Sequence, residues 1–319
     1  MRTFEDKVAT RAQVPLLIGL VGASGSGKTM SALRLATGIQ RVSGGEIYYL
    51  DTEARRSLYY ADSFKFRHVD FQAPFGPLDY LSAIEHCAKK GAKTIVVDSF
   101  SHEHAGVGGV LEMHEAESQR LAKQWNTTLD KVKMSAWQKP KAERSRLLNA
   151  MLQMPVNFIL CFRAKEKMDL SGPKPVLMGW LPVAGEEFVY EMSLNCLLYP
   201  SSGGVPSWQP EEKGEKAIIK LPGQFRSIFE KREPLSEDIG EKLARWAAGG
   251  VAAQVPKVAE PTPPVDVVDV MTGDEFESIE EQIRAAPDLD SAKFIANKHR
   301  ARFLPDQKKA VSAMLESFK

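Results

Sequence analysis

The segment from Gly22 to Thr29 constrains the fold more than any other part of the chain. It fits the pattern G-x-x-x-x-G-K-[ST] at every fixed position. A continuous apolar run, residues 16–21, leads directly into it, and the helix-forming residues 30–35 follow directly after it. This order predicts a buried strand, a glycine-rich turn and a helix, which makes a chance match a poor explanation.

The spacing of this segment suits the binding of a triphosphate. Its glycines let the backbone curl so that successive N–H groups point at the phosphates, and the positive end of the following helix attracts the same anion. Lys28 is expected to reach the β- and γ-phosphates, and the Thr29 hydroxyl to bind Mg²⁺. The residues predicted to bind ATP are Gly22, Ala23, Ser24, Gly25, Ser26, Gly27, Lys28 and Thr29.

Two acidic residues at strand ends are candidates for the rest of the site. Asp98 closes the apolar run 94–97, a pattern typical of a carboxylate that holds Mg²⁺. Glu53 follows the apolar run 47–50 and is the candidate for orienting or deprotonating an attacking water. Asp51 is the other candidate for that role. The alternative interpretation of both residues is an acid that is simply solvated in a loop.

Apolar runs alternate with helical patterns along most of the chain. This alternation predicts an α/β fold, a mainly parallel sheet flanked by helices. The expected strands are 16–21, 47–50, 66–71, 94–97, 156–162, 188–199 and 216–221, the last two as a possible hairpin. The expected helices are 27–39, a helix that begins at Pro77, 140–154 and 235–247, and the polar stretch 101–138 is expected to be helical in its middle.

Composition divides the chain of 319 residues into three parts. Residues 1–248 are the predicted core, residues 249–271 are a linker rich in Pro, Ala and Val, and residues 272–319 are a small helical module. The net charge of +1 indicates no bulk attraction to nucleic acid or membrane, so any such surface must be local. The three cysteines lie in apolar stretches and indicate buried thiols in a reducing compartment.

The order of these motifs resembles the ATPase core of RecA-like recombinases. The residues that carry the resemblance are the phosphate loop, the strand that ends in Asp51-Thr52-Glu53, and the strand that ends in Asp98-Ser99. In that family a glutamate at the first strand end activates water and an aspartate at the second holds the metal. The resemblance therefore implies a RecA-like P-loop fold, with Glu53 and Asp98 in those two roles.

Within that family, the chain most resembles RecA-related ATPases of bacteriophage recombination modules, also described as phage nucleotide-binding proteins or AAA-family ATPases. The resemblance spans residues 15–247. It implies an ATP-hydrolysing protein that acts on single-stranded DNA in recombination, annealing or repair, and that assembles as a homo-oligomer.

One departure from the family concerns the strand 156–162. RecA-like proteins carry Gln or Asn after it, a residue that senses the γ-phosphate and couples it to DNA. Here the chain reads Arg163-Ala164-Lys165. Arg163 or Lys165 is the candidate substitute, contacting the γ-phosphate in its own subunit or in a neighbouring one; charges that merely line a solvated strand exit are the alternative.

The segments 101–139 and 165–186 correspond to the DNA-binding loops of the family. The first combines lysines with Trp125 and Trp137, which suits single-stranded nucleic acid. The helical spacing of Leu121, Trp125 and Leu129 instead favours Trp125 as a core residue. The second has lysines among glycines and prolines, which is typical of a mobile loop.

Basic residues gather in the C-terminal module, from Lys293 to Lys309. A solvated helix face explains them, and docking of DNA or of a recombination or single-strand-binding protein is the functional alternative. Two other functions are open: a nucleotide-gated adaptor that recruits a replication or recombination partner, and a P-loop kinase for small molecules. No apolar run is long enough to span a membrane, and the expected location is the cytoplasm, the host's if a phage encodes the chain.

Overall fold

The computed structural model describes residues 6, 14–172, 174–249, 273–300 and 302–318. The chain divides into two compact units, Met1–Ala253 and Gln254–Lys319. Apart from Gly249, the expected linker 249–271 lies outside the described residues. Among the described residues, no helix has the length and apolar character needed to cross a membrane.

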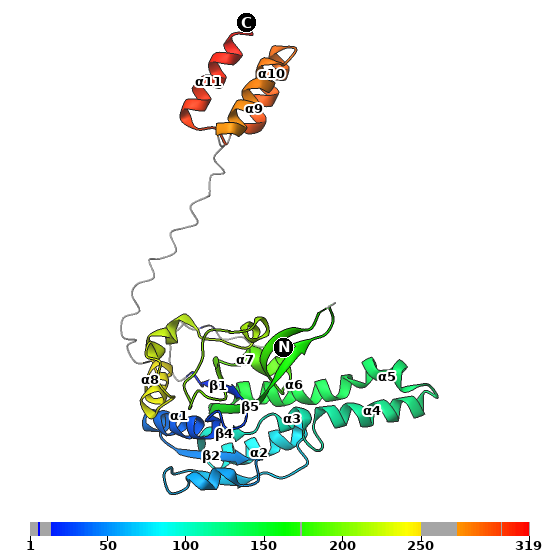
Figure 1. Cartoon of the computed structure of the whole chain (residues 1–319), viewed down its shortest axis with the longest axis vertical. Helices are drawn as coiled ribbons and strands as arrows, with labels where there is room; N and C mark the ends of the chain where they lie inside the picture. The colour runs from blue at the N-terminus through cyan, green and yellow to red at the C-terminus, as the bar shows by residue number, and fades with distance from the viewer. Residues whose placement is uncertain (1–5, 7–13, 173, 250–272, 301, 319) are drawn as a thin grey trace. The chain divides into compact units, whose positions relative to one another are not determined.

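A seven-stranded sheet forms the centre of the first unit (Figure 1). Six strands are parallel in the order β3-β2-β4-β5-β1-β7, and β6 pairs antiparallel with β5. The strands are β1 (Leu17–Gly22), β2 (Glu46–Asp51), β3 (Arg67–Asp70), β4 (Ala92–Asp98), β5 (Asn157–Asp169), β6 (Val176–Pro182) and β7 (Leu194–Leu198). The predicted α/β class with a mainly parallel sheet is therefore confirmed.

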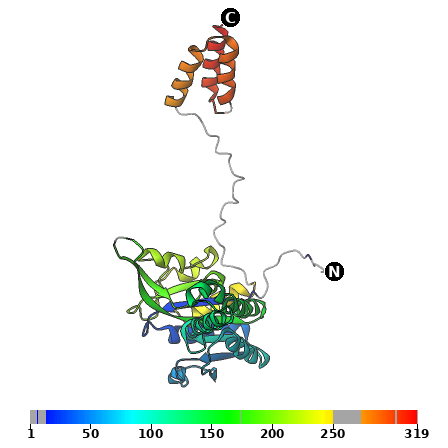
Figure 2. The same cartoon turned by 90° about the vertical axis from the view of Figure 1, so that its right-hand side faces the viewer.

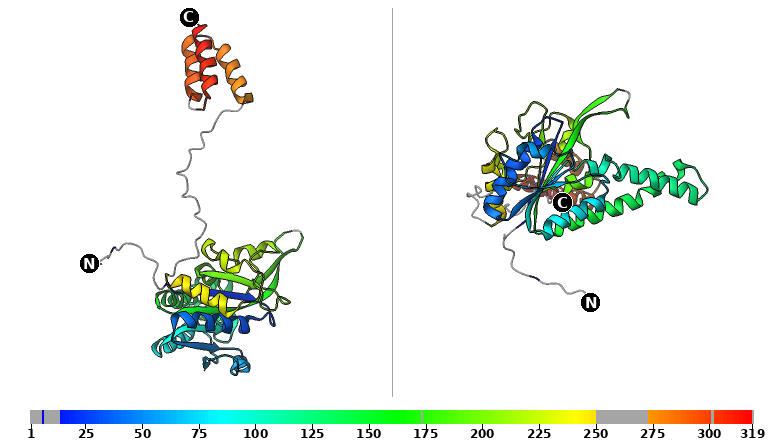
Figure 3. Two further views of the ribbon diagram at one scale, coloured as in Figure 1. Left: turned by 90° about the vertical axis from the view of Figure 1, so that its left-hand side faces the viewer. Right: turned by 90° about the horizontal axis from the view of Figure 1, so that it is seen from below.

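Helices cover both faces of this sheet (Figure 3). Those of the first unit are α1 (Lys28–Ser43), α2 (Pro77–Lys89), α3 (His102–Ala105), α4 (Val110–Gln124), α5 (Leu129–Ala136), α6 (Gln138–Gln153), α7 (Glu186–Glu191) and α8 (Glu237–Ala247). Ile18 and Leu20 of β1 pack with α1 and α8, whereas Leu17 and Val21 pack with α2, α6 and α7. This strict alternation follows from the two-residue period of a strand, and each fully buried Leu or Ile contributes about 1.5–3 kcal/mol.

Two glycines bring α1 and α8 close together. A Cβ atom on Gly38 would lie 1.9 Å from the carbonyl oxygen of Glu237, and one on Gly240 would lie 2.3 Å from that of Leu35. Any larger residue at either position would force the helices apart. This close packing holds α1, whose first turn carries Lys28 and Thr29, firmly against the sheet.

Helices α4, α5 and the start of α6 form an arm that projects from the core (Figure 1). Its own small core consists of Leu121, Ala122, Val132 and Ala136. The interpretation of Trp125 as a core residue is wrong, because its side chain is 52% exposed. Helix α4 ends at Gln124 and Asn126 adopts a φ of 48°, so the helical spacing is broken at a turn.

The prediction that residues 165–186 form a mobile loop is also wrong. Strand β5 continues to Asp169, well past the predicted end at 162, and forms with β6 a hairpin that projects from the core (Figure 2). In register, Lys165 lies opposite Leu181 and Lys167 opposite Gly179. Charged residues fill this part of β5 because it lies beyond the buried sheet.

The two late strands were also predicted too broadly. Residues 186–191 form helix α7, and only Leu194–Leu198 form a strand. Residues 213–217 form a 3₁₀ helix, and Lys220 makes one isolated bridge to Asn195. Short apolar runs do not distinguish a strand from a buried helix, and Phe188 and Met192 are buried at helical spacing.

The second unit contains α9 (Gly273–Arg284), α10 (Leu289–His299) and α11 (Pro305–Glu316). Its core is Ile279, Ile283, Ala292, Ala296, Phe303 and Val311. Helix α10 begins at an Asp288 cap, whose side chain accepts a 2.8 Å bond from the Ser291 N–H. These helices agree with the C-terminal helical element of the predicted fold.

Candidate phosphate and metal site

The glycine-rich turn connects two buried elements. Strand β1 is buried along its whole length and ends at Gly22, and α1 begins at Lys28. Gly25 and Gly27 have φ angles of 77° and 93°, in the left-handed region that favours glycine. A Cβ atom on Gly27 would also lie 3.0 Å from the backbone nitrogen of Gly204. The glycines at these positions are therefore required by backbone conformation and by close packing.

Lys28 lies over the turn that precedes it. Its Nζ donates to the carbonyl oxygens of Gly22 at 2.9 Å and Ala23 at 2.7 Å. Beside it, the Ser26 hydroxyl is buried and has no hydrogen-bond partner among the described residues. This side chain is 0% exposed, so it lies on the core side of the turn. The open side is at Gly25, where a Cβ atom would meet nothing within 4 Å. The Lys28 cation and the loop amides suit the anion that the sequence predicts.

Thr29 and Asp98, the predicted metal ligands, are brought together. The Thr29 hydroxyl donates to Asp98 Oδ2 at 2.7 Å, and the Tyr49 hydroxyl donates to the same oxygen at 2.8 Å. Burial raises the pKa of Asp98, against the effect of these two hydrogen bonds and of the Lys28 charge. Hydroxyl and carboxylate oxygens are the ligands that Mg²⁺ prefers, so this donor set fits the ion.

The geometry separates the two acids that follow β2. The Asp51 carboxylate accepts bonds from the Glu53 N–H at 2.8 Å, the Ser57 N–H at 2.9 Å and the Ser57 hydroxyl at 2.5 Å. It is 1% exposed and serves to close the loop 51–57. The Glu53 carboxylate instead faces Arg163, which donates from Nε at 2.7 Å and from a second guanidinium nitrogen. Glu53 is thus the acid whose carboxylate reaches another strand of the site.

Arg163 lies on β5, directly opposite Gly22 of β1 in the sheet register. Its backbone N–H donates to the Ser101 hydroxyl at 2.8 Å. Its side chain is 47% exposed, compared with 15% for Glu53. Lys165, the other candidate, lies two residues further along β5, opposite Leu181 in the hairpin. Of the two, Arg163 is the cation that lies beside the phosphate loop.

Three residues of the site could not be identified from the sequence: Tyr49, Thr52 and His102. The Thr52 hydroxyl accepts from the Ser99 N–H at 2.7 Å and lies 2.7 Å from His102 Nδ1, so it ties the ends of β2 and β4 together. Burial and the charge of Arg163 lower the pKa of His102. The signal for Thr52 was its place between Asp51 and Glu53 in the motif at the strand end, whereas Tyr49, inside the strand, gave none.

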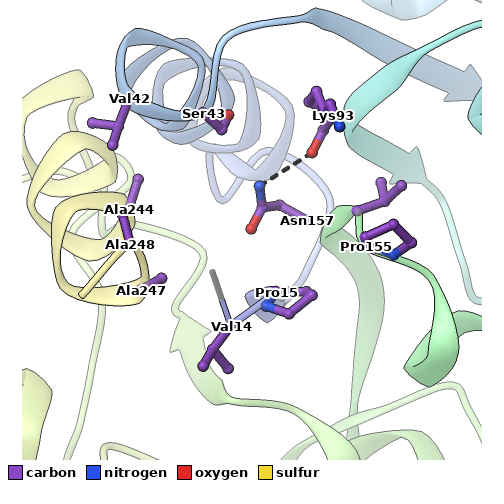
Figure 4. Close-up of a pocket in the computed structure, with 11 residues that line it drawn as sticks. Val14, Pro15, Val42, Ser43, Lys93, Pro155, Asn157, Ala244, Ala247 and Ala248 are labelled. Atoms are coloured by element: carbon purple, nitrogen blue, oxygen red, sulfur yellow. Dashed lines mark hydrogen bonds between the residues drawn. The ribbon is translucent and has the colours of Figure 1, made fainter. Parts of the chain in front are cut away.

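A cavity of about 210 Å³ opens at the edge of the sheet that is opposite to the phosphate loop (Figure 4). It is lined by residues at the amino ends of strands, among them Pro15, Lys93 and Asn157. The Asn157 amide donates to the Lys93 carbonyl at 3.1 Å and closes one side. Parallel strands bring their carboxyl ends to the other edge, so this cavity is separate from the phosphate loop.

The comparisons with known proteins agree with this geometry. The model of a family described as "AAA domain" matches residues 15–194, more than half of the chain. No curated protein matches the sequence. The matched region contains the phosphate loop, Glu53, Asp98 and Arg163. The chain therefore belongs to the AAA domain family of P-loop ATPases.

Proposed function

We propose that this AAA-type ATPase hydrolyses ATP and couples hydrolysis to single-stranded DNA, in recombination or annealing of the phage type. The observation that carries the proposal is the convergence of Glu53, Asp98 and Arg163, from three strands, on the edge of the sheet where the phosphate loop lies. The resemblance to RecA-like recombinases supports the DNA part.

In the proposed reaction, the loop amides and Lys28 bind the phosphates. Thr29 and Asp98 would hold Mg²⁺, and the ion would offset the negative charge of the phosphate oxygens. A water molecule attacks the γ-phosphorus, the bond to the bridging oxygen of ADP breaks, and Glu53 accepts the proton of the water. Arg163 stabilises the negative charge that develops on the transferred group.

The ion pair between Glu53 and Arg163 connects these roles. A γ-phosphate beside Gly22 competes with Glu53 for the guanidinium, because both are anions within reach of the same side chain. Release of Arg163 leaves the Glu53 carboxylate able to accept a proton. In this chain, arginine thus takes the position of the amide that RecA-like proteins use to sense the γ-phosphate.

Two projecting segments support an interaction with single-stranded DNA. The β5–β6 hairpin is continuous with Arg163, and it carries Lys167 together with Met168 and Leu170, which are 57% and 72% exposed. The arm exposes Trp125, and Lys123, two residues earlier in the chain, is also exposed. Cations attract phosphates and exposed apolar or aromatic side chains contact bases, the combination that single-strand binding needs.

The test is phosphate release with and without single-stranded DNA at low salt. The wild-type chain should hydrolyse ATP, and DNA should increase the rate. Glu53→Gln should lower the rate by about 10²–10³-fold while ATP still binds. Glu46→Gln is the matched control, since Glu46 begins the strand that Glu53 follows and also pairs with an arginine, Arg67. It should retain wild-type turnover.

The outcomes separate the alternatives. No stimulation, together with no retention of DNA, would remove the DNA half of the proposal. Slow turnover that Glu53→Gln leaves unchanged would favour a nucleotide-gated adaptor, for which the C-terminal unit with its own core offers a docking module. Phosphate release without any acceptor counts against a kinase. Assembly into a homo-oligomer and docking of a recombination protein belong to the same proposal.

A further inference from the structure

A large cavity opens beyond the carboxyl end of β7, the strand beside β1. Its volume is about 960 Å³, and it is lined by residues 199–202, 205–211 and 229–232. The chain turns back after β7, where the Ser207 N–H donates to the Leu197 carbonyl at 2.8 Å. This turn places Tyr199, Ser202 and Trp208 on the wall of one cavity.

Residues 203 and 204 connect the lining residues Ser202 and Val205, and they lie against the phosphate loop. Gly204 packs on Gly27, and a Cβ atom on Gly204 would lie 3.0 Å from the Ser31 hydroxyl in the first turns of α1. The Gly204 carbonyl also accepts a 3.0 Å bond from the Leu235 N–H, which fixes the segment. Ser202, two residues earlier, is thus held close to the loop.

The order of the strands gives a direction to the bound triphosphate. Glu53, Asp98 and Arg163 follow or lie on β2, β4 and β5, all on one side of β1. The γ-phosphate must lie on that side, where the metal ligands and the base are. The opposite end of the triphosphate then leaves the loop toward β7, where the cavity begins.

The wall of the cavity suits a nucleoside. The indole ring of Trp208 rests on Phe229, with centroids 4.6 Å apart and planes at 59°, so its position is fixed before a ligand arrives. The Ser202 hydroxyl is buried without a hydrogen-bond partner among the described residues. An aromatic ring for stacking and an unsatisfied hydroxyl match the base and the ribose of a nucleotide.

We propose that the cavity bounded by Ser202, Trp208 and Phe229 binds the nucleoside part of the ATP whose phosphates the loop holds. The proposal rests on the proposed function, since it assigns the remainder of the same substrate. Trp208 stacks on the base, and Ser202 hydrogen-bonds the sugar. Nothing in the phosphate-loop motif itself identifies these residues.

The test compares two probes on the full-length chain, ATP and inorganic tripolyphosphate, each with Mg²⁺. Trp208→Ala should weaken ATP binding about tenfold, as removal of one stacking ring does, and leave tripolyphosphate binding unchanged. Trp208→Phe should retain most of the affinity for ATP. Tyr190→Ala, which removes an exposed aromatic ring of α7, is the matched control and should change neither affinity.

Tryptophan fluorescence gives an independent reading that does not depend on affinity. ATP should change the emission of the wild-type chain and tripolyphosphate should not. The change should disappear in Trp208→Phe and persist in Trp180→Phe, whose ring packs against the other apolar cluster. Unchanged ATP affinity in Trp208→Ala, or equal weakening of both ligands, overturns the cavity assignment. Unchanged affinity for both ligands in Lys28→Ala instead overturns the phosphate loop, and with it the proposed function.

Discussion

The carboxylate of Glu53 and the guanidinium of Arg163 come from strands that β4 separates in the sheet. Their side chains are 15% and 47% exposed, and ion pairs at such positions contribute only about 0–1 kcal/mol to stability. Replacing either residue should therefore leave the fold intact. A loss of hydrolysis in such a variant can be attributed to chemistry.

Arg163→Gln should lower ATP hydrolysis by at least about 10²-fold without loss of nucleotide binding, because an arginine that stabilises a transferring phosphoryl group contributes that much or more. Since Arg163 reaches Glu53 of its own chain, we expect it to act within its own subunit. Mixing inactive Arg163→Gln and Glu53→Gln chains should then restore no phosphate release. Recovery in the mixture would show that a neighbour supplies the arginine; Arg67→Gln, which breaks the exposed Glu46 pair, is the control.

The sequence predicts those site residues that one continuous segment positions. The prediction of Gly22–Thr29 depends on the spacing of residues within one segment. The prediction of Glu53 and Asp98 depends on the rule that acids at the ends of parallel strands lie at the same edge of the sheet. Tyr49 could not be predicted, because its contact with Asp98 depends on the register between β2 and β4. The prediction that Trp125 is a core residue was wrong because the helical spacing of the sequence does not indicate the turn after Gln124.

At the scale of elements, three helices meet at a buried ion pair. Glu103 of α3 accepts two bonds from Arg144 of α6, at 3.0 and 2.9 Å, and Glu187 of α7 lies 3.5 Å from the same guanidinium. Arg144 also donates to His104 Nδ1 at 3.0 Å. This cluster anchors the segment that follows β4 to the helices that cover one face of the sheet.

Stability should depend on the protonation of His104. Burial and the charges of Arg144 and Lys167 lower the pKa of His104 from 6.5 to about 4, with Glu187 acting in the opposite direction. Below pH 6.5 the unfolded chain therefore binds a proton that the folded chain does not, and stability falls by about 1–2 kcal/mol between pH 6.5 and 5. Thermal melts of His104→Asn, which keeps an acceptor, should show a smaller decrease; His86→Asn, an exposed histidine of α2, should melt as the wild type does.

The sequence indicates β1, β2, β4 and the first half of β5 well, since each contains a continuous apolar run. It does not indicate the β5–β6 hairpin, because beyond Ala164 the side chains of β5 are exposed and have no apolar pattern. Residues 164–169 of β5 are held by backbone pairing with β6, and backbone pairing does not affect the amino-acid composition. The hairpin is the element on which the DNA proposal is best tested.

Reversing charges on the hairpin should weaken DNA binding selectively. Lys167→Glu combined with Lys174→Glu should lower DNA retention and DNA-stimulated hydrolysis and leave hydrolysis without DNA unchanged. The slope of log affinity against log salt should decrease by about 1 for each DNA phosphate that the variant no longer neutralises. Lys242→Glu, at an exposed position of α8, should alter neither quantity. An undiminished DNA response in the double variant would place the DNA-binding surface elsewhere.

At the scale of the whole molecule, the chain consists of two compact units with separate apolar cores. Both clusters that flank the sheet consist of residues from the first unit, and helix α8, which completes one of them, ends at Ala247. The core of the second unit draws only on α9 to α11 and the turn at Phe303. Each core can therefore form without side chains from the other unit.

A chain that ends at Gly249 should fold and hydrolyse ATP at the wild-type rate, within about twofold, because it keeps every residue of the site and both large cores. Its melting temperature should match the main transition of the full-length chain. The separate segment 273–319 should be helical but weakly stable, since about 45 residues bury few apolar side chains. If the shortened chain lost turnover while its melting temperature held, the C-terminal unit would contribute to the ATPase site. If it kept turnover but lost retention of a partner protein, recruitment would belong to α9–α11.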